Sequence, residues 1–214
     1  MKKVTKKDTQ EIKNRLIERY GSATTELHYR NDFELLIAIS LSAQCTDKRV
    51  NLITPALFEA YPNPQTLADA NINHVKSLIN TCSFFNNKAE NIIKMAQQVC
   101  TRHNGTIPHD ENALKNLAGV GQKTAHVFMI EALGHNLMAV DTHVFRTSHR
   151  LGLSQSLTPA KTEEDLVKLF KTDLSILHQG LVLFGRYVCT AKNPKCDECF
   201  LPEFCKTKES FKPR

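Results

Sequence analysis

Apolar residues recur along this chain at the spacing of an α-helix rather than of a strand. The first apolar face lies near the N-terminus and consists of Ile12, Leu16, Ile17 and Tyr20. Asp8 followed three residues later by Glu11 has the spacing of a capping box, so we predict that a helix opens there. Gly21 follows the last apolar position and is expected to end this helix.

The next segment is apolar almost all round. Asn31 followed by Glu34 predicts its start, and residues 35–41 read LLIAISL. A helix without a polar face is buried in the centre of a domain, so we expect this segment to form the middle of a helical core.

Helical faces continue through the rest of the chain, within residues 72–79, 89–99 and 166–170. Thr158 followed by Pro159 predicts the start of the last of these helices, because Pro is favoured at the first helical position. Turn residues mark connections at 61–64, 103–105 and 151–153. No sustained alternation of apolar and polar residues occurs, and we therefore predict an all-α protein.

A length of 214 residues predicts one or two domains that can bury a core without disulfide bonds. The hydrophobic fraction of 41% and charged fraction of 23% exclude a disordered tail and a collagen-like chain. No stretch approaches the roughly 18 consecutive apolar residues of a membrane span. The basic N-terminus is not followed by the apolar segment of a secretory signal, so we expect a cytoplasmic protein.

The formal net charge is +6, from 28 Lys and Arg against 22 Asp and Glu. Its sign suits an anionic partner such as nucleic acid. An excess of this size is equally compatible with a basic protein that binds no polyanion, so charge alone does not decide between the two.

Four of the seven cysteines fall within 17 residues near the C-terminus, with the spacing C-x6-C-x2-C-x5-C. They are Cys189, Cys196, Cys199 and Cys205. So short a segment has no core of its own, so we expect these thiolates to bind either zinc or an iron–sulfur cluster. Zinc ribbons usually pair two short C-x2-C knuckles, and the single knuckle here favours a 4Fe–4S cluster over zinc. The remaining cysteines lie in or beside apolar segments and are interpreted as small core residues: Cys45, Cys82 and Cys100.

Residues 117–125 read LAGVGQKTA, in which Gly119 and Gly121 predict a tight hairpin between two helices. The helix that ends at Leu117 and the helix that follows would form a corner whose free N–H groups suit a phosphodiester. Lys123 lies in the first turn of the second helix, where the helix dipole disfavours its ammonium form. A larger neutral fraction would make Lys123 a nucleophile, although a simple phosphate contact is the alternative.

Asp141 lies within Val140–Arg146, between apolar residues and at an expected helix start. A carboxylate there can take part in proton transfer, but an ordinary N-cap aspartate is the default interpretation. His143 is interpreted as a packed or surface histidine rather than as a catalyst.

Taken together, these residues resemble the endonuclease III family of DNA glycosylases over about residues 10–207. Residues 117–125 are similar to the family's LPGVGRKTA, residues 140–143 read VDTH as in the family, and the cysteine spacing is the same. Residues 41–47, LSAQCTD, are similar to its LLSAQ-x-TD segment, and residues 86–91, NNKAEN, to its N-x-KAENI segment. Five motifs in family order make the resemblance specific.

The sequence also departs from the family pattern. Ala118 replaces the hairpin proline, which is expected to loosen the turn, and His126 replaces a usual asparagine. Ser83 and Phe84 replace a glycine and a smaller apolar residue in a loop that reaches into the duplex in the family. We therefore expect the damage preference to differ.

The resemblance implies two lobes. Residues 25–134 would form a six-helix barrel with the helix–hairpin–helix, and residues 1–24 with 135–214 would form a domain carrying the 4Fe–4S cluster. DNA would lie between the lobes, with Lys123 and Asp141 facing one another. The resemblance also places Gln44 in the space that a flipped nucleotide vacates and Phe84 against the opposite strand.

We accordingly predict a bifunctional DNA glycosylase and abasic-site lyase that excises oxidised pyrimidines from double-stranded DNA through a Lys123 Schiff base. Lys192 and Lys195, in the first loop of the cysteine motif, are expected to contact phosphates, and the less favoured alternative is that both are solvated surface charges. The alternatives are an adenine or mismatch glycosylase without lyase activity, which usually lacks such a lysine, and a non-catalytic DNA-binding module. The family implies a monomer in a bacterial-type cytoplasm, associated with the nucleoid when on DNA.

Overall fold

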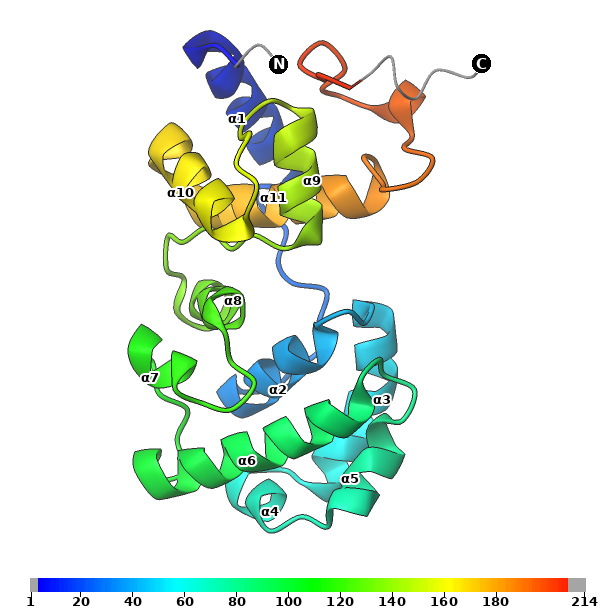
Figure 1. The fold of residues 1–214 in the computed structure, drawn as a ribbon, viewed down its shortest axis with the longest axis vertical. Helices are drawn as coiled ribbons and strands as arrows, with labels where there is room; N and C mark the ends of the chain where they lie inside the picture. Colours follow the sequence, from blue (N-terminus) through cyan, green and yellow to red (C-terminus); the bar gives the residue numbers. More distant parts are fainter. Residues whose placement is uncertain (1–3, 208–214) are drawn as a thin grey trace. The chain divides into compact units, whose positions relative to one another are not determined.

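The computed structural model describes residues 4–207, and within them all regular elements are helical: eleven α-helices and one short 3₁₀ turn (Figure 1). The prediction of an all-α protein is confirmed. The chain divides into two compact units. One comprises residues 25–133, and the other combines residues up to 24 with residues from 134 onward.

The unit of residues 25–133 is built around α2 (Asp32–Ser42), which packs against α3, α6 and α8. Phe33, residues 35–39 and Leu41 are buried, as the almost uniformly apolar sequence predicts. The Glu34 carboxylate is buried as well and accepts hydrogen bonds from Arg30. The other helices of this unit are α3 (Asp47–Ala60), α4 (Pro64–Ala68), α5 (Ile72–Ile79), α6 (Phe85–His103), α7 (Glu111–Lys115) and α8 (Gln122–Leu133).

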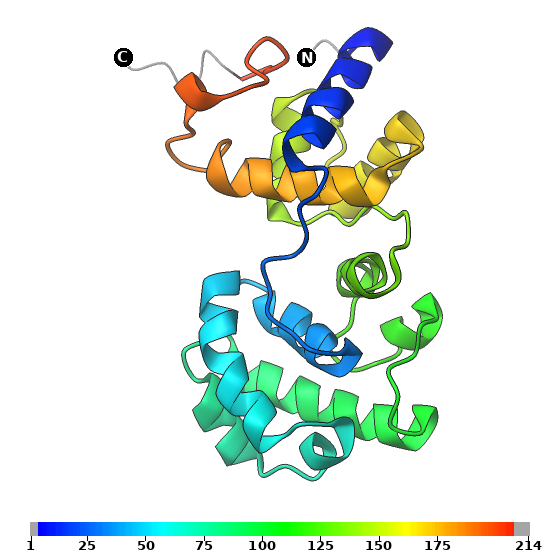
Figure 2. The ribbon, with the colours of Figure 1, turned by 180° about the vertical axis from the view of Figure 1, so that it is seen from behind.

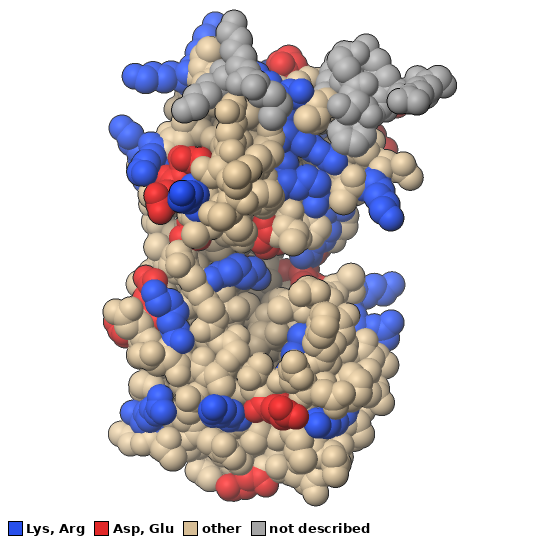
Figure 3. Space-filling model, viewed as in Figure 1, with Lys and Arg blue, Asp and Glu red and all other residues tan. Residues whose placement is uncertain are grey.

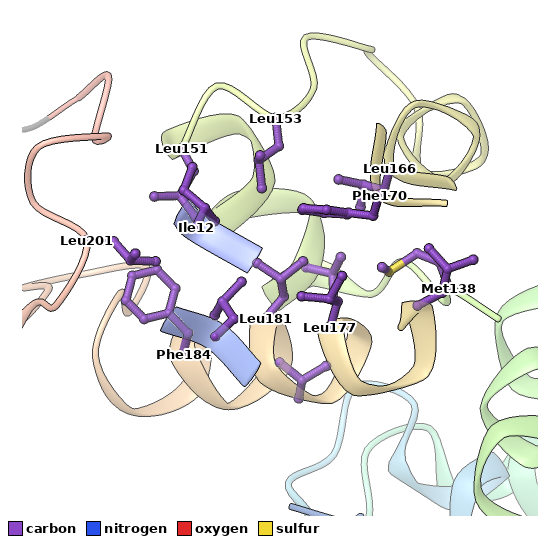
Figure 4. Packing of buried hydrophobic residues seen from close by; sticks show 14 of the residues in the cluster. Ile12, Met138, Leu151, Leu153, Leu166, Phe170, Leu177, Leu181, Phe184 and Leu201 are labelled. Atoms are coloured by element: carbon purple, nitrogen blue, oxygen red, sulfur yellow. The ribbon is translucent and has the colours of Figure 1, made fainter. Parts of the chain in front are cut away.

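The second unit is built around α11 (Leu174–Tyr187), with α1 (Lys6–Tyr20) and α9 (Thr142–Arg150) packed against it. The two ends of the chain therefore share one core, and both ribbon views show the C-terminal end of α1 meeting α11 at a steep angle (Figures 1 and 2). α10 (Pro159–Phe170) packs on α1 and α9. Figure 4 shows Ile12 of α1 among Leu177, Leu181 and Phe184 of α11, all of them buried.

Side-chain caps fix most helix starts where the sequence predicts them. The Asn31 side chain accepts a hydrogen bond from the Glu34 N–H, and Thr158 caps α10 with Pro159 at the first helical position. The predicted start of α1 at Asp8 is wrong. Thr5 is the N-cap, because its hydroxyl accepts from the Asp8 N–H while the Asp8 carboxylate accepts from the Thr5 N–H.

No helix within residues 4–207 combines the length and apolarity needed to cross a membrane.

Candidate functional site

The predicted helix–hairpin–helix is present as α7, a turn and α8, although α7 ends at Lys115, two residues before the predicted Leu117. The Val120 N–H donates to the Leu117 carbonyl at 3.1 Å and closes the turn. Gly119 has φ +76°, and a Cβ there would lie 3.0 Å from the Cβ of Asn91 in α6. This position therefore needs glycine both for its left-handed backbone and for the close approach of α6.

The amide of Ala118 has a partner that a proline at this position could not have. Its N–H donates to the Gln98 Oε1 at 2.7 Å, and the Gln98 Nε2 donates to the Asn116 carbonyl at 3.5 Å. A single side chain of α6 thus binds the hairpin on both sides of Leu117. Gln98 was not recognised in the sequence.

His126 joins the two arms of the hairpin. Its buried side chain places Nε2 3.3 Å from the Glu111 carboxylate, at the start of α7. The pKa of Glu111 is lowered by its hydrogen bond to Lys115 and also by His126. The replacement of the family's asparagine by His126 therefore supplies a contact between α7 and α8.

Lys123 is the second residue of α8, so its predicted place in the first helical turn is confirmed. Its side chain is half-buried. Gly121, immediately before the helix, is exposed. The N-terminal end of a helix carries partial positive charge, and the expected enlargement of the neutral fraction of Lys123 by this charge stays a prediction.

Asp141 is the N-cap of α9, and its Oδ1 accepts a hydrogen bond from the Val144 N–H at 2.7 Å. The side chain is half-buried and follows the buried residues Met138, Ala139 and Val140. The N-cap interpretation is thus confirmed. The capping hydrogen bond uses only one of the about four acceptor positions that a carboxylate offers, so Asp141 can accept further hydrogen bonds.

The C-terminal end of α9 donates hydrogen bonds to the segment that follows α11. The Arg150 guanidinium donates to the carbonyls of Thr190 at 2.7 Å and Ala191 at 3.2 Å, and to the Cys189 thiol at 3.3 Å. Arg146 donates to the carbonyls of Gly185 and Cys189. Figure 3 shows Lys and Arg side chains gathered over α9.

The packing of α9 on α11 depends on Gly185. A Cβ at this position would lie 3.0 Å from the Cβ of His143 and 3.1 Å from Cγ2 of Thr147. His143 is half-buried with its Nδ1 3.2 Å from Arg146, so its interpretation as a packed residue is consistent with these contacts.

All four cysteines of the C-terminal motif line one pocket, whose other walls include Leu151, Phe184, Val188 and Leu201. Two of the sulfurs lie beside hydrogen-bond donors: Cys189 beside Arg150, and Cys199 beside the Leu201 N–H at 3.4 Å. Burial raises the pKa of the Cys196 and Cys199 thiols, and the neighbouring cysteines raise them further.

Within residues 4–207, no three Cys, His, Asp or Glu side chains converge closely enough to hold a single metal ion. Four thiols around an apolar pocket, with N–H donors at the sulfurs, fit the donor set of an iron–sulfur cluster. Such a cluster would be held by Cys189, Cys196, Cys199 and Cys205.

The two residues expected to probe a duplex are both exposed, and both have a left-handed backbone conformation. Gln44 follows the end of α2 with φ +53°, and Phe84 precedes α6 with φ +57°. An exposed fraction of 63% is unusual for a phenylalanine, and it leaves the ring available to a partner.

Lys192 and Lys195 are exposed in the loop between the first two cysteines of the motif. The Thr190 hydroxyl ties this loop back by donating to the carbonyls of Lys192 and Asn193. Lys195 lies 3.7 Å from the Glu198 carboxylate.

The prediction that the other three cysteines are core residues holds only for Cys82. Cys45 and Cys100 are only half-buried: Cys45 lies in the connection between α2 and α3, and Cys100 lies in the last turn of α6.

Comparison with known proteins agrees with these features. Residues 37–172 match the HhH-GPD superfamily of base excision DNA repair proteins, and residues 189–205 match the iron–sulfur binding domain of endonuclease III. Endonuclease III of Haemophilus influenzae is 44% identical over 93% of this chain and 95% of its own length. The chain belongs to the endonuclease III family.

Other members show the same extent of similarity. The Escherichia coli endonuclease III is 40% identical over 93% of this chain and 95% of its own length. The structure of a trapped endonuclease III–DNA covalent intermediate superposes with a TM-score of 0.92 at 38% identity, covering 97% of this chain and 98% of that one. A non-covalent endonuclease III–DNA complex matches equally well.

The endonuclease III family consists of base excision repair enzymes, DNA glycosylases with abasic-site lyase activity that carry a 4Fe–4S cluster. The predictions of a DNA repair enzyme of this kind and of a 4Fe–4S cofactor are therefore confirmed. The match of residues 189–205 decides between the iron–sulfur and zinc interpretations of the cysteine motif.

We predict that Gln98→Leu lowers the free energy of unfolding by about 1 kcal/mol, because it leaves the Ala118 N–H without its acceptor. In an Ala118→Pro background the same substitution is expected to cost less, since proline has no N–H to satisfy. Chemical denaturation of the four proteins of this cycle measures the coupling. Equal costs in both backgrounds would show that Gln98 does not act through the Ala118 amide.

We also predict about four irons per chain in protein purified without oxygen, with broad visible absorption. Cys196→Ser is expected to lose iron, whereas Cys100→Ser, outside the motif, is expected to retain it. Metal analysis of the three proteins decides the matter, and one zinc per chain without iron would contradict the assignment.

Proposed function

We propose that this chain is a bifunctional DNA glycosylase and abasic-site lyase that removes oxidised pyrimidines from double-stranded DNA, with Lys123 as its nucleophile. The observation that carries the proposal is the half-buried Lys123 in the first turn of α8, directly after the exposed Gly121. The trapped covalent DNA intermediate of a similar endonuclease III supports a covalent mechanism.

In this mechanism the neutral amine of Lys123 attacks C1′ of the flipped nucleotide, and the bond to the base breaks. The sugar ring then opens to a Schiff base between Lys123 and C1′. Loss of a proton from C2′ breaks the C3′–O bond, so the strand is nicked and the 3′ phosphate leaves. The helix dipole at α8 favours the required neutral amine.

Asp141 supplies the negative charge that this reaction needs. As an anion it stabilises the positive charge that develops on the sugar, and it assists proton transfer to the departing base. Capping of α9 through Oδ1 fixes the carboxylate in place. The mechanism requires that Lys123 and Asp141 meet at the same nucleotide when DNA is bound.

The remaining site residues are assigned to binding. Gln44 occupies the space that the flipped nucleotide leaves, and Phe84 contacts the opposite strand, roles that suit their exposed left-handed positions. The backbone around Gly119 and Gly121 binds a phosphodiester. The cluster is structural and holds the loop that presents Lys192 and Lys195 to phosphates.

The proposal extends to organisation and location. Residues 25–134 are the helix–hairpin–helix barrel domain, and residues 1–24 with 135–214 are the iron–sulfur cluster domain. The enzyme acts as a monomer in a bacterial-type cytoplasm and on the nucleoid. The bacterial origin of the similar endonuclease III proteins supports this location.

Lys123→Ala is expected to abolish excision and strand cleavage while leaving binding to damaged duplex largely intact, because only the nucleophile is removed. Asp141→Asn is expected to slow excision by about 100- to 10,000-fold, the usual range for loss of an acid–base group. Borohydride trapping on a panel of lesion duplexes measures both effects, with Lys94→Ala, an exposed lysine of α6, as the control.

The same assay separates the alternatives. An adduct formed by Lys123→Ala at the wild-type rate would contradict the nucleophile assignment. Excision by the wild type without any trapped adduct would identify a glycosylase without lyase activity, and binding without excision would identify a non-catalytic module.

Lys192→Ala with Lys195→Ala is expected to flatten the slope of log affinity against log salt by up to about 1.8, or about 0.9 for each phosphate contact. The loss should be similar for damaged and undamaged duplex, because phosphate contacts do not read the base. Salt titration of binding to an uncleavable lesion duplex measures the slope. The matched control removes two exposed lysines of α10, Lys161 and Lys168. An unchanged slope in the test protein would remove the loop from the DNA interface.

A further inference from the structure

Lys88 of α6 is a buried lysine with an exposed fraction of only 8%, and the proposed reaction does not use it. A buried ammonium is costly unless its donors are satisfied. All three donors of Lys88 have partners: its Nζ lies 2.8 Å from the Leu41 carbonyl, 2.6 Å from the Ala43 carbonyl and 3.2 Å from the Cys82 thiol.

Two of these partners belong to the C-terminal end of α2. The last turn of α2 contains no basic residue of its own, so the ammonium of Lys88 supplies the positive charge that this end of the helix favours. The Ala43 carbonyl lies in the same peptide plane as the Gln44 nitrogen. The bond from Lys88 therefore fixes one side of Gln44, whose φ of +53° is a strained value for a non-glycine residue.

The third partner connects the same ammonium to the segment that carries Phe84. The Cys82 thiol lies two residues before Phe84 and also donates to the Leu41 carbonyl at 3.3 Å. The backbone N–H of Lys88 donates to the Phe84 carbonyl at 3.1 Å, as part of the first turn of α6. Lys88 thus contacts both the segment that leads to Gln44 and the segment that leads to Phe84, two exposed residues with left-handed backbone conformation.

We propose that Lys88 is a positioning residue that holds Gln44 and Phe84 in register with each other for probing the duplex. The inference rests on the proposed function, since it takes these two residues as the ones that enter the DNA. Lys88 itself touches neither DNA nor the reacting atoms. It acts by fixing the backbone on which the two probes stand.

The test compares Lys88→Met with wild type on two substrates, using the full chain with its cluster. On a duplex carrying one thymine glycol, kcat/KM for excision is expected to fall by about 10- to 100-fold, since a misplacement of about 1 Å has effects of this size. On a single-stranded oligonucleotide with an abasic site, no nucleotide has to leave a stack. Cleavage of that oligonucleotide should therefore be unchanged.

The control is Lys94→Met, which removes a positive charge from an exposed position of the same helix and should behave as wild type on both substrates. Fluorescence of 2-aminopurine beside the lesion reports nucleotide extrusion directly and should fall with Lys88→Met. Should that variant not fold, Lys88→Arg replaces it, because a branched guanidinium cannot place its donors on all three acceptors. The same direction of change is expected.

A second comparison shows whether Lys88 acts through the probes. In a Gln44→Ala, Phe84→Ala background, Lys88→Met should add little further loss of duplex excision, because the residues that it positions are already gone. A full additional loss there, or an equal loss on single-stranded DNA, would overturn the positioning role. So would an unchanged duplex activity.

Failure of the proposed function gives a different result. If Lys123→Ala leaves trapping intact, the mechanism fails whatever Lys88 does. If Gln44→Ala with Phe84→Ala leaves duplex excision and extrusion intact, the probes are misassigned and the role of Lys88 is overturned with them.

Discussion

The close crossing of α9 over α11 is the contact on which the chemistry of the second unit depends. Because Gly185 has no side chain, His143 and Thr147 approach the α11 backbone so closely that a Cβ at this position would lie about 3 Å from both of them. α9 has nine residues, and its two ends have different roles. Asp141 caps the first end, and Arg150 binds the cysteine segment at the other.

The cluster site and the carboxylate are consequently linked by one short helix. Arg150 holds the carbonyls of Thr190 and Ala191 and contacts the Cys189 sulfur, so the start of the cysteine loop is fixed to the helix that Asp141 begins. A 4Fe–4S cluster held by these cysteines would fix the segment that Arg150 binds, and through it the far end of α9. In the proposed function, whose chemistry transfers no electrons, the cluster therefore has a structural role.

The unit of residues 25–133 follows a similar logic with α6 as its support. Gly119 approaches Asn91, Gln98 binds the hairpin backbone, and Lys88 binds the end of α2. The hairpin and the Gln44 segment are thus both held by side chains of one long helix. α6 therefore supports both the segment proposed to bind phosphate and the segment proposed to probe the duplex.

Much of this arrangement could be predicted because its signals are local. The burial of α2 follows from its uniformly apolar sequence, and the caps at Asn31, Asp141 and Thr158 follow from residue type and spacing. The start of α1 was misplaced because Thr5 lies in a basic segment with no apolar periodicity around it. Its cap becomes visible only through the reciprocal bonds with Asp8.

The supporting residues could not be predicted, because their partners are distant backbone atoms. Lys88 binds the Ala43 carbonyl 45 residues earlier, and Arg150 binds the Thr190 carbonyl 40 residues later. Every residue has a carbonyl, so such a bond leaves no pattern of residue types in the sequence. The extra donor of Ala118 is a partial exception, since the missing hairpin proline shows that an N–H is present there and needs an acceptor.

The most direct test of the account is to locate the covalent bond that the enzyme forms with DNA. The wild-type adduct is reduced with borohydride, digested with trypsin and mapped by mass spectrometry. The account predicts the sugar remnant on Lys123, with cleavage blocked after that residue because its amine is modified. A remnant on any other lysine, with Lys123 unmodified and cleaved normally, would contradict it.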